Sequence, residues 1–208
     1  YYDVGVSHQM TAAWQVGVDG YYKDISNLLD EGQFGQAQIF SPFNYAHGRI
    51  WGVELTTSYR RGNFSSYFNV AASRAEGKNV VSGQYNFDLT ELAYIASHYV
   101  HLDHDQLWTA SGSLAYRWHA TDLSTTAVYG SGLRRGFANT ETLPAYTVVN
   151  LGAQHSFRLP AVGVLELRFS LVNLFDQVYE LRDGTGIGVG SAHFGMRRGV
   201  FAGITKRI

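Results

Sequence analysis

The segment SHYVHLDHDQ holds the densest group of side chains able to bind a ligand. His98, His101 and His104 occur in it together with Asp103 and Asp105. Imidazole nitrogens and carboxylate oxygens bind transition metals and can also contact an iron chelate. Because residues three apart alternate between the two faces of a strand, the three imidazoles would converge only in a helical or irregular loop. These residues are candidates for a ligand-binding loop, and a polar loop that leads into a strand is the other interpretation.

Two adjacent arginines form a second candidate site. Arg134 and Arg135, in YGSGLRRGF, follow an expected strand and could contact an anionic ligand. Arginines at a membrane interface can equally hold lipopolysaccharide or extend toward the head groups. Asn173 and Asp176 break the alternation of their strand, which predicts a bulge or turn. The glycine-rich segment 184–190 opens no helix, so we expect a loop rather than a phosphate-binding turn. We assign no metal and no cofactor to these residues.

The spacing of nucleophiles and bases does not favour an enzyme. A hydrolase needs a nucleophile, a base and an orienting group brought together. Ser97 with His98, and Ser191 with His193, are only neighbours in the sequence. We therefore expect a protein without catalytic activity.

Composition narrows the class of protein that must position these groups. The 208 residues are 45% apolar and only 16% charged, whereas ordinary soluble domains carry about 25% charged residues. No apolar run approaches the roughly 18 residues of a membrane-spanning helix. Cysteine is absent and the net charge is −1, which excludes disulfide scaffolds and disfavours nucleic acid as a partner. The sequence begins without an initiator methionine or a leader, so we expect a mature piece or a fragment.

Apolar and polar residues alternate with a period of two along most of the chain, which indicates β-strands. In the clearest run, Leu165, Leu167 and Phe169 alternate with Glu166 and Arg168. No helical stripe of comparable length occurs. Alternation predicts about nine strands, at residues 2–6, 14–23, 51–60, 64–73, 108–118, 123–129, 149–157, 165–171 and 200–208.

Two features favour a transmembrane β-barrel over a soluble sandwich. The apolar face carries no charge at mid-strand, while the other face is rich in Ser, Thr, Gly, Asn and Gln and includes Asp19, Glu54, Glu166 and Arg168; this composition suits a wet lumen. The connections also alternate in length, as in outer-membrane barrels. Short ones fall near 8–13, 60–63, 119–122 and 159–163, and long ones near 29–47, 79–103, 136–143 and 182–191.

Aromatic residues toward the strand ends are typical of the girdles at membrane interfaces. We assign to such girdles Tyr21, Tyr22, Tyr59, Tyr116, Trp118, Tyr129, Tyr146 and Tyr179.

An odd number of strands cannot close a barrel in which every neighbour is antiparallel, because the first and last strands run the same way. An open edge in lipid leaves backbone groups unpaired. We therefore expect the chain to be the last nine strands of a larger barrel, entering from outside at Tyr1 and ending inside at Ile208. A short hairpin hidden in 79–103 would change the count.

The C-terminal residues resemble the TonB-dependent outer-membrane receptors. FSLVNLFDQVYELRD, with Asn173, Leu174, Phe175, Asp176 and Tyr179, is similar to their penultimate strand. RRGVFAGITKRI, with Arg198, Phe201, Ala202 and Gly203, is similar to their last strand, although family barrels usually end in Phe or Trp and this chain ends in Ile208. HGRIWGVELTTSY and LDHDQ also resemble segments of family members.

The resemblance implies an all-β, antiparallel transmembrane barrel of 22 strands, of which residues 1–208 are the C-terminal portion, without the plug domain and the TonB box. It implies TonB-energised uptake of a scarce nutrient, first of all an iron-siderophore, across the outer membrane of a Gram-negative bacterium. The implied partners are lipid and lipopolysaccharide, the N-terminal barrel and plug polypeptide, the TonB complex through that plug, and a small-molecule ligand held by the outer loops, with His98, His101, His104, Arg134 and Arg135 as candidates. A small stand-alone porin-like barrel for passive diffusion is the alternative.

Overall fold

Nine long strands form one continuous antiparallel sheet. The computed structural model describes residues 1–35, 39–160 and 163–207. Each long strand pairs with the next one along the chain, in the order β1-β2-β3-β4-β6-β7-β10-β11-β14, and the short β5 (Val100–His101) pairs with β4 off this path. The long strands are β1 (Tyr2–Thr11), β2 (Trp14–Gln33), β3 (Phe40–Arg61), β4 (Phe64–Val80), β6 (Trp108–Trp118), β7 (Thr121–Gly130), β10 (Tyr146–Leu159), β11 (Gly163–Val172) and β14 (Gly199–Arg207).

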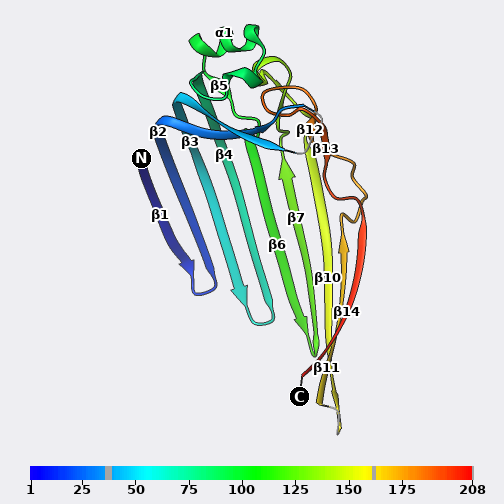
Figure 1. Cartoon of the computed structure of the whole chain (residues 1–208). Helices are drawn as coiled ribbons and strands as arrows, with labels where there is room; N and C mark the ends of the chain where they lie inside the picture. Colours follow the sequence, from blue (N-terminus) through cyan, green and yellow to red (C-terminus); the bar gives the residue numbers. More distant parts are fainter. Residues whose placement is uncertain (36–38, 161–162, 208) are drawn as a thin grey trace.

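All nine strands predicted from alternation are therefore confirmed, with Ile208 outside the described residues. Within the described part, β1 and β14 each have a partner on one edge only. Both run from the end of the sheet that carries the long connections to the end that carries the short turns (Figure 1). The sheet is thus open, and its two free edges are parallel to one another.

The register aligns apolar side chains from strand to strand. Val18 lies opposite Leu55, Leu55 opposite Val70, Val70 opposite Ala110, and Ala110 opposite Tyr129. Because side chains alternate along each strand, this row defines one continuous apolar face of the sheet. The described residues contain no helix long and apolar enough to cross a membrane.

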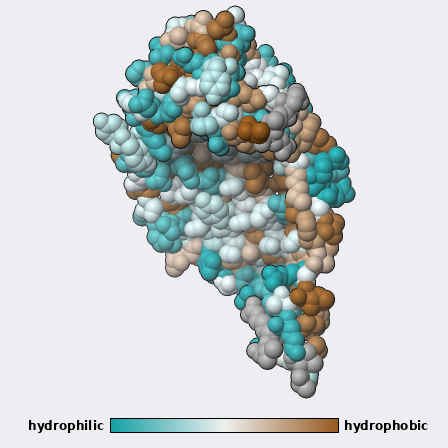
Figure 2. All heavy atoms as spheres, in the orientation of Figure 1, coloured by the Kyte–Doolittle hydropathy of each residue, from teal (hydrophilic) through white to brown (hydrophobic). Residues whose placement is uncertain are grey.

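The opposite face is polar and concave. Asp19 lies opposite Glu54 in the register, and the Asn69 amide donates a short hydrogen bond to Glu54. The surface turned toward the viewer in Figure 2 is mostly pale to teal and is hollowed beneath an overhanging upper part. A wall with one apolar and one polar face is the arrangement expected of a barrel with a wet lumen.

The aromatic assignments are confirmed in part by the register. The side chains of Tyr22, Tyr59, Tyr116, Trp118 and Tyr129 share the apolar face. Tyr21 and Tyr146 lie on the polar face instead, and Tyr179 lies outside the strands. The rings of Tyr146 and Tyr179 stack with their centroids 4.5 Å apart, so they pack on each other rather than on lipid.

The short turns lie where the alternation predicted them, at 12–13, 62–63 and 119–120; the fourth falls partly on residues outside the described part. The predicted loop over 29–47 is wrong for its described residues. Pairing between β2 and β3 continues to Gln33 opposite Phe40. A transmembrane strand needs only about 9–11 residues, so these strands of 20 and 22 residues extend beyond any membrane. Their distal part crosses over the upper ends of neighbouring strands (Figure 1).

The long connection predicted at 79–103 is present between β4 and β6, and it contains a helix that the sequence did not predict. β4 runs to Val80, and η1 (Gln84–Asn86), α1 (Leu89–Ser97) and β5 follow. Asp88 caps α1 by accepting a hydrogen bond of 2.7 Å from the Thr90 amide. The helix is nine residues long, which is too short for its apolar period to stand out in the sequence.

These segments assemble into what we call the cap: the distal β2–β3 hairpin and residues 81–107, 131–145 and 173–198. Its small elements are β8 (Arg134–Arg135), η2 (Phe137–Asn139), β9 (Glu141–Thr142), β12 (Glu180–Asp183) and β13 (Ala192–Phe194). The main hydrophobic core lies here, since a single-layered sheet has no interior of its own. Phe43 and Phe87 pack edge to face with their ring centroids 5.0 Å apart, and Tyr45 and Ile95 are fully buried beside them.

Candidate functional site

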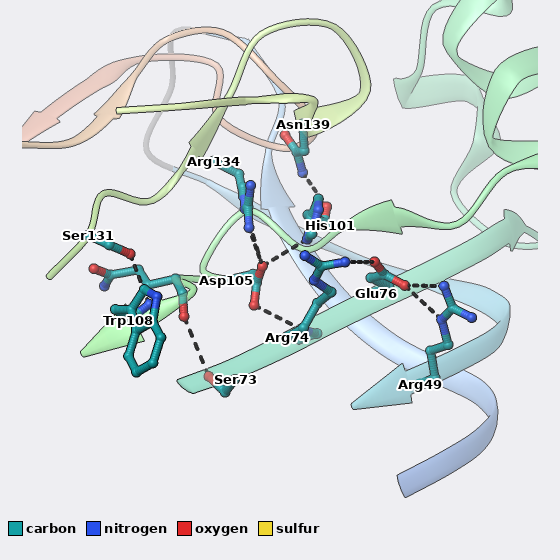
Figure 3. Close-up of polar contacts among 12 residues, drawn as sticks. Arg49, Ser73, Arg74, Glu76, His101, Asp105, Trp108, Ser131, Arg134 and Asn139 are labelled. Carbon is teal, nitrogen blue, oxygen red and sulfur yellow. Dashed lines mark hydrogen bonds and ion pairs between the residues drawn. The ribbon is translucent and has the colours of Figure 1, made fainter. Parts of the chain in front are cut away.

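A buried carboxylate, Asp105, joins two segments of the cap, 81–107 and 131–145, to strand β4 (Figure 3). Its Oδ2 accepts hydrogen bonds from Arg134 Nη2 at 2.9 Å and Nε at 3.2 Å, and lies 2.8 Å from His101 Nδ1. Its Oδ1 accepts from the Ala75 amide of β4 at 2.9 Å. Only 4% of Asp105 and 8% of Arg134 are exposed. Burial raises the pKa of Asp105, but the hydrogen bonds from His101 and Ala75 and the charge of Arg134 outweigh it and hold the pKa below its ordinary value.

A second carboxylate, Asp103, binds Arg182 of β12. Arg182 Nη2 lies 2.5 Å from its Oδ2, and His104 Nδ1 lies 2.9 Å from its Oδ1. The Asp103 carboxylate raises the pKa of His104 through this hydrogen bond. Asp103 is buried, whereas His104 is largely exposed. The pair therefore stands at the surface of the cap.

Asp30 comes to the same place from β2. It is 9% exposed, and its carboxylate accepts one hydrogen bond, of 2.9 Å, from the Glu31 amide. Burial raises the pKa of Asp30 to about 6. Ligand atoms of Asp30, Asp103 and His104 lie within 4.8 Å of one another. Within the described residues, this is the only group of three or more such side chains close enough to hold a metal ion.

Asn139 fastens the 131–145 loop to its neighbours. Its side chain donates to the His101 carbonyl at 2.8 Å and accepts from the Ile187 amide at 2.9 Å, and the residue is fully buried. Arg135, which is about half exposed, pairs with Asp183 at 3.3 Å and with Glu141 at 3.2 Å. Adjacent arginines thus have different surroundings, because one faces the interior of the cap and the other its surface.

The five residues predicted to bind ligand are separated by the fold. His101 and Arg134 meet at Asp105, so both are held by a buried ion pair. His104 joins Asp103 and Asp30. Arg135 lies in its own surface pairs, and His98 follows α1, where its ring stacks on Tyr94 with centroids 4.2 Å apart. The three histidines therefore do not form one site.

The residues that complete these clusters come from distant parts of the sequence. Asp30, Arg182 and Asn139 were not expected, because each lies in a polar stretch with no spacing that marks it. Pairing of β2 with β3 to its distal end carries Asp30 into the cap. Only the assembled loops bring Arg182 to Asp103, 79 positions away.

The turn after β11 is stabilised by Asn173 and Asp176, as the break in alternation predicted. Both have positive φ, 50° and 52°. Arg197 donates to Asp176 at 2.8 Å, and the Arg198 amide donates at 3.0 Å. The hydrogen bonds from Arg197 and then from Arg198 hold the pKa of Asp176 well below its ordinary value. Two residues with left-handed backbone end the strand here.

This turn is expected to loosen in acid. A carboxyl whose pKa is lower in the folded state stabilises the fold above its ordinary pKa, and this contribution is lost as the pH falls from about 4 toward the folded-state pKa. We expect amide exchange in 173–198, corrected for its intrinsic rate, to rise as the pH is lowered through this range. Asp176→Asn should already show the faster exchange at neutral pH and a flatter pH dependence. An unchanged pH dependence in that variant would contradict the role of Asp176.

Comparisons with known proteins agree with the architecture. The family model "TonB dependent receptor-like, beta-barrel" matches residues 1–174. No curated protein matches the sequence. Several solved structures are similar to the chain. The ferric citrate transporter FecA in the unliganded form has 16% identity over 96% of this chain and a TM-score of 0.67. The FrpB iron transporter (F3-3 variant) from Neisseria meningitidis has 17% identity over 97% of this chain and a TM-score of 0.62, and the copper transporter OprC has 16% identity over 97% and a TM-score of 0.63. The chain spans 30% of the length of each.

Proposed function

This chain belongs to the TonB-dependent receptor β-barrel family, and we propose that it supplies the C-terminal barrel wall and part of the outer cap of a receptor that imports a scarce nutrient, first of all an iron-siderophore. Receptor barrels of this family lie in the outer membrane of Gram-negative bacteria. The family consists of transporters rather than enzymes, in line with the missing catalytic spacing. The fold of this chain is part of an antiparallel barrel.

The open sheet is the observation that carries this proposal. The two free edges, β1 and β14, run in the same direction, so further strands are needed between them to keep every neighbour antiparallel. An odd number of added strands meets this requirement, and a lipid-exposed edge would otherwise leave backbone groups unpaired. The same reasoning disfavours a stand-alone porin. If the isolated chain formed a closed, heat-resistant, ion-conducting monomer in detergent, the receptor proposal would fail.

The expected partners follow from the proposed role as the C-terminal barrel wall of a receptor. The remaining strands and the plug come from other receptor parts, and the TonB complex acts through that plug. Lipopolysaccharide would meet the apolar face beside the cap, where Arg49 pairs with Glu76 at 2.6 Å (Figure 3). The Arg49 guanidinium also lies 4.1 Å from the centre of the Tyr99 ring. Arg74, on the same face, is about half exposed. Cations beside aromatic rings suit an anionic amphiphile at the interface.

The choice of an iron chelate is supported by the printed functions of similar structures. FecA and FrpB are named as iron transporters and OprC as a copper transporter. At 16–17% identity these likenesses show the fold alone, so the ligand is tested directly. The complete receptor should restore growth under iron limitation with at least one ferric siderophore of a panel, and that chelate should quench its tryptophan fluorescence. Growth rescue by copper alone, with no response to any ferric chelate, would overturn the choice.

The apolar face makes a further prediction about membrane insertion. Val70→Lys is expected to lower the free energy of unfolding by about 2–4 kcal/mol in lipid, because a cation then faces hydrocarbon at mid-depth. Asn69→Lys is the matched control: it lies at the same depth on the polar face, where Glu54 can pair with the new ammonium. Urea unfolding of the complete receptor in liposomes measures both. Equal losses in the two variants would contradict the assignment of the faces.

A further inference from the structure

We propose that Asp30, Asp103 and His104 form a binding site for a divalent transition-metal ion of the Zn²⁺ class in the cap. Their ligand atoms lie within 4.8 Å of one another, although the residues come from β2 and from the connection between β5 and β6. The site is independent of the nutrient that the receptor imports. Metal binding here would join the β2–β3 hairpin to the loop that carries Asp103.

The donor set selects the class of ion. Two carboxylates and one imidazole suit Zn²⁺ and its first-row neighbours, whereas Ca²⁺ and Mg²⁺ are bound by oxygen ligands. Arg182 occupies Oδ2 of Asp103, and Oδ1 is the atom that faces His104. Metal–ligand bonds of about 2.0–2.2 Å require the three groups to move slightly closer together. His104 can make this adjustment, because 62% of its side chain is exposed.

The buried hydroxyl of Tyr45 provides a second, independent argument. Tyr45 is completely buried, and its hydroxyl has no hydrogen-bond partner among the described residues. Tyr45 lies opposite Leu28 in the register of β2 and β3, so its side chain shares a face of the hairpin with Asp30, two residues further along β2. A bound water or ion is one of the arrangements that satisfy such a buried polar group. A hydrated cation between the carboxylates would give the hydroxyl a water to bond.

The charge balance points the same way. Asp30 accepts a hydrogen bond from a backbone amide and has no ion pair with a lysine or arginine in the described part of the chain, while Asp103 pairs with Arg182 and with His104. The two buried carboxylates therefore share one permanent cation, Arg182. A buried carboxylate without a counter-charge is costly. A divalent ion would neutralise this excess negative charge, and exposed His104 leaves the site open to solvent.

The test measures metal binding by the complete receptor in detergent, without nutrient. We expect one Zn²⁺ per receptor to be lost on Asp30→Asn, and at least about a tenfold weaker affinity on His104→Gln. Both variants should fold, because the first removes a buried charge and the second alters an exposed side chain. Co²⁺ should show a visible absorption band that Zn²⁺ abolishes. Zn²⁺ should also slow amide exchange in both 27–33 and 100–107, the two segments that the ion joins.

His98→Gln is the matched control, because His98 is a neighbouring histidine of the cap that lies outside this group. It should leave Zn²⁺ binding unchanged. Zn²⁺ binding that survives in the Asp30→Asn and His104→Gln double variant would overturn the proposal, as would binding lost only in the His98 variant. Preference for Ca²⁺ over Zn²⁺ would overturn the assignment to a transition metal. None of these outcomes depends on which nutrient is imported.

Discussion

Replacing Asp105 with alanine is expected to destabilise the cap by about 3–5 kcal/mol, which is the usual cost of leaving one partner of a buried ion pair alone. Arg134, of which only 8% is exposed, would lose the carboxylate that pairs with its buried guanidinium. His101 and the Ala75 amide would lose their acceptor as well. The loss should be local, because the long strands of the sheet pair independently of this carboxylate.

Amide exchange measures this effect as the free energy of opening of segments 100–107 and 131–143 in the complete receptor. Arg135→Ala is the matched control: 40% of its side chain is exposed in its pairs with Glu141 and Asp183, and exposed pairs contribute about 0–1 kcal/mol each. Asp105→Leu combined with Arg134→Met should recover most of the lost stability, because it removes both charges together. A cap that opens no more readily in Asp105→Ala than in Arg135→Ala would show that the buried pair does not join the loops.

The strands of the sheet could be predicted from the sequence because each strand has an apolar surrounding on one side and a polar one on the other throughout its length. Each lies in a single layer with one apolar and one polar side, so alternation persists from residue to residue. Strand β11 shows this alternation, with Leu165, Leu167 and Phe169 on one side and Glu166 and Arg168 on the other. The short turns follow, since they are the places where the alternation stops and restarts. The odd strand count then implied the open sheet that the structure shows.

The segments of the cap do not have one apolar and one polar side in this way, which explains the errors in predicting them. Leu28, Phe43 and Tyr45 are buried between the hairpin and the segments above it, so the distal parts of β2 and β3 are covered in a way that lipid and lumen do not impose. Apolar and polar residues therefore alternate less regularly in these distal parts, and the sequence there resembles that of a loop. The helix α1 was missed because Ile95 is its one fully buried residue.

The candidate site could be predicted as a region but not as a set of contacts. The density of His and Asp in 98–105 predicted a ligand-binding loop. In the structure His101 and His104 contact Asp105 and Asp103 in the cap, and ligand binding by these residues stays a prediction. The members of this segment separate because β5 pairs with β4 while His98 still belongs to the end of α1. Asp30 and Arg182 lie 73 and 79 positions from Asp103, and no local pattern could connect them. Their placement depends on the packing of whole loops.

The second large effect is expected at Asn173, which ends β11. Its side chain donates to the carbonyls of Gln177 and Met196, both at 2.9 Å, and accepts from the Gln177 amide at 2.9 Å, while the residue is 1% exposed. Asn173→Ala removes all three hydrogen bonds, each worth about 1 kcal/mol or more when its partner stays buried. It also places alanine at a φ of 50°, at a cost of about 1 kcal/mol. We expect a total loss of about 3–5 kcal/mol in the opening free energy of 173–198.

Asn173→Gly separates the two causes, because glycine tolerates this φ but makes none of the side-chain bonds. Its expected loss is smaller than that of alanine by about 1 kcal/mol. Asn86→Ala is the control, since the side-chain nitrogen of Asn86 has no hydrogen-bond partner in the described part of the chain, and its loss should change the exchange of the cap little. If alanine and glycine at position 173 gave equal losses, the left-handed backbone would carry no cost, and the three hydrogen bonds alone would account for the asparagine. If neither variant opened the turn, the approach of Met196 to Asn173 would be held by the pair between Asp176 and Arg197 instead.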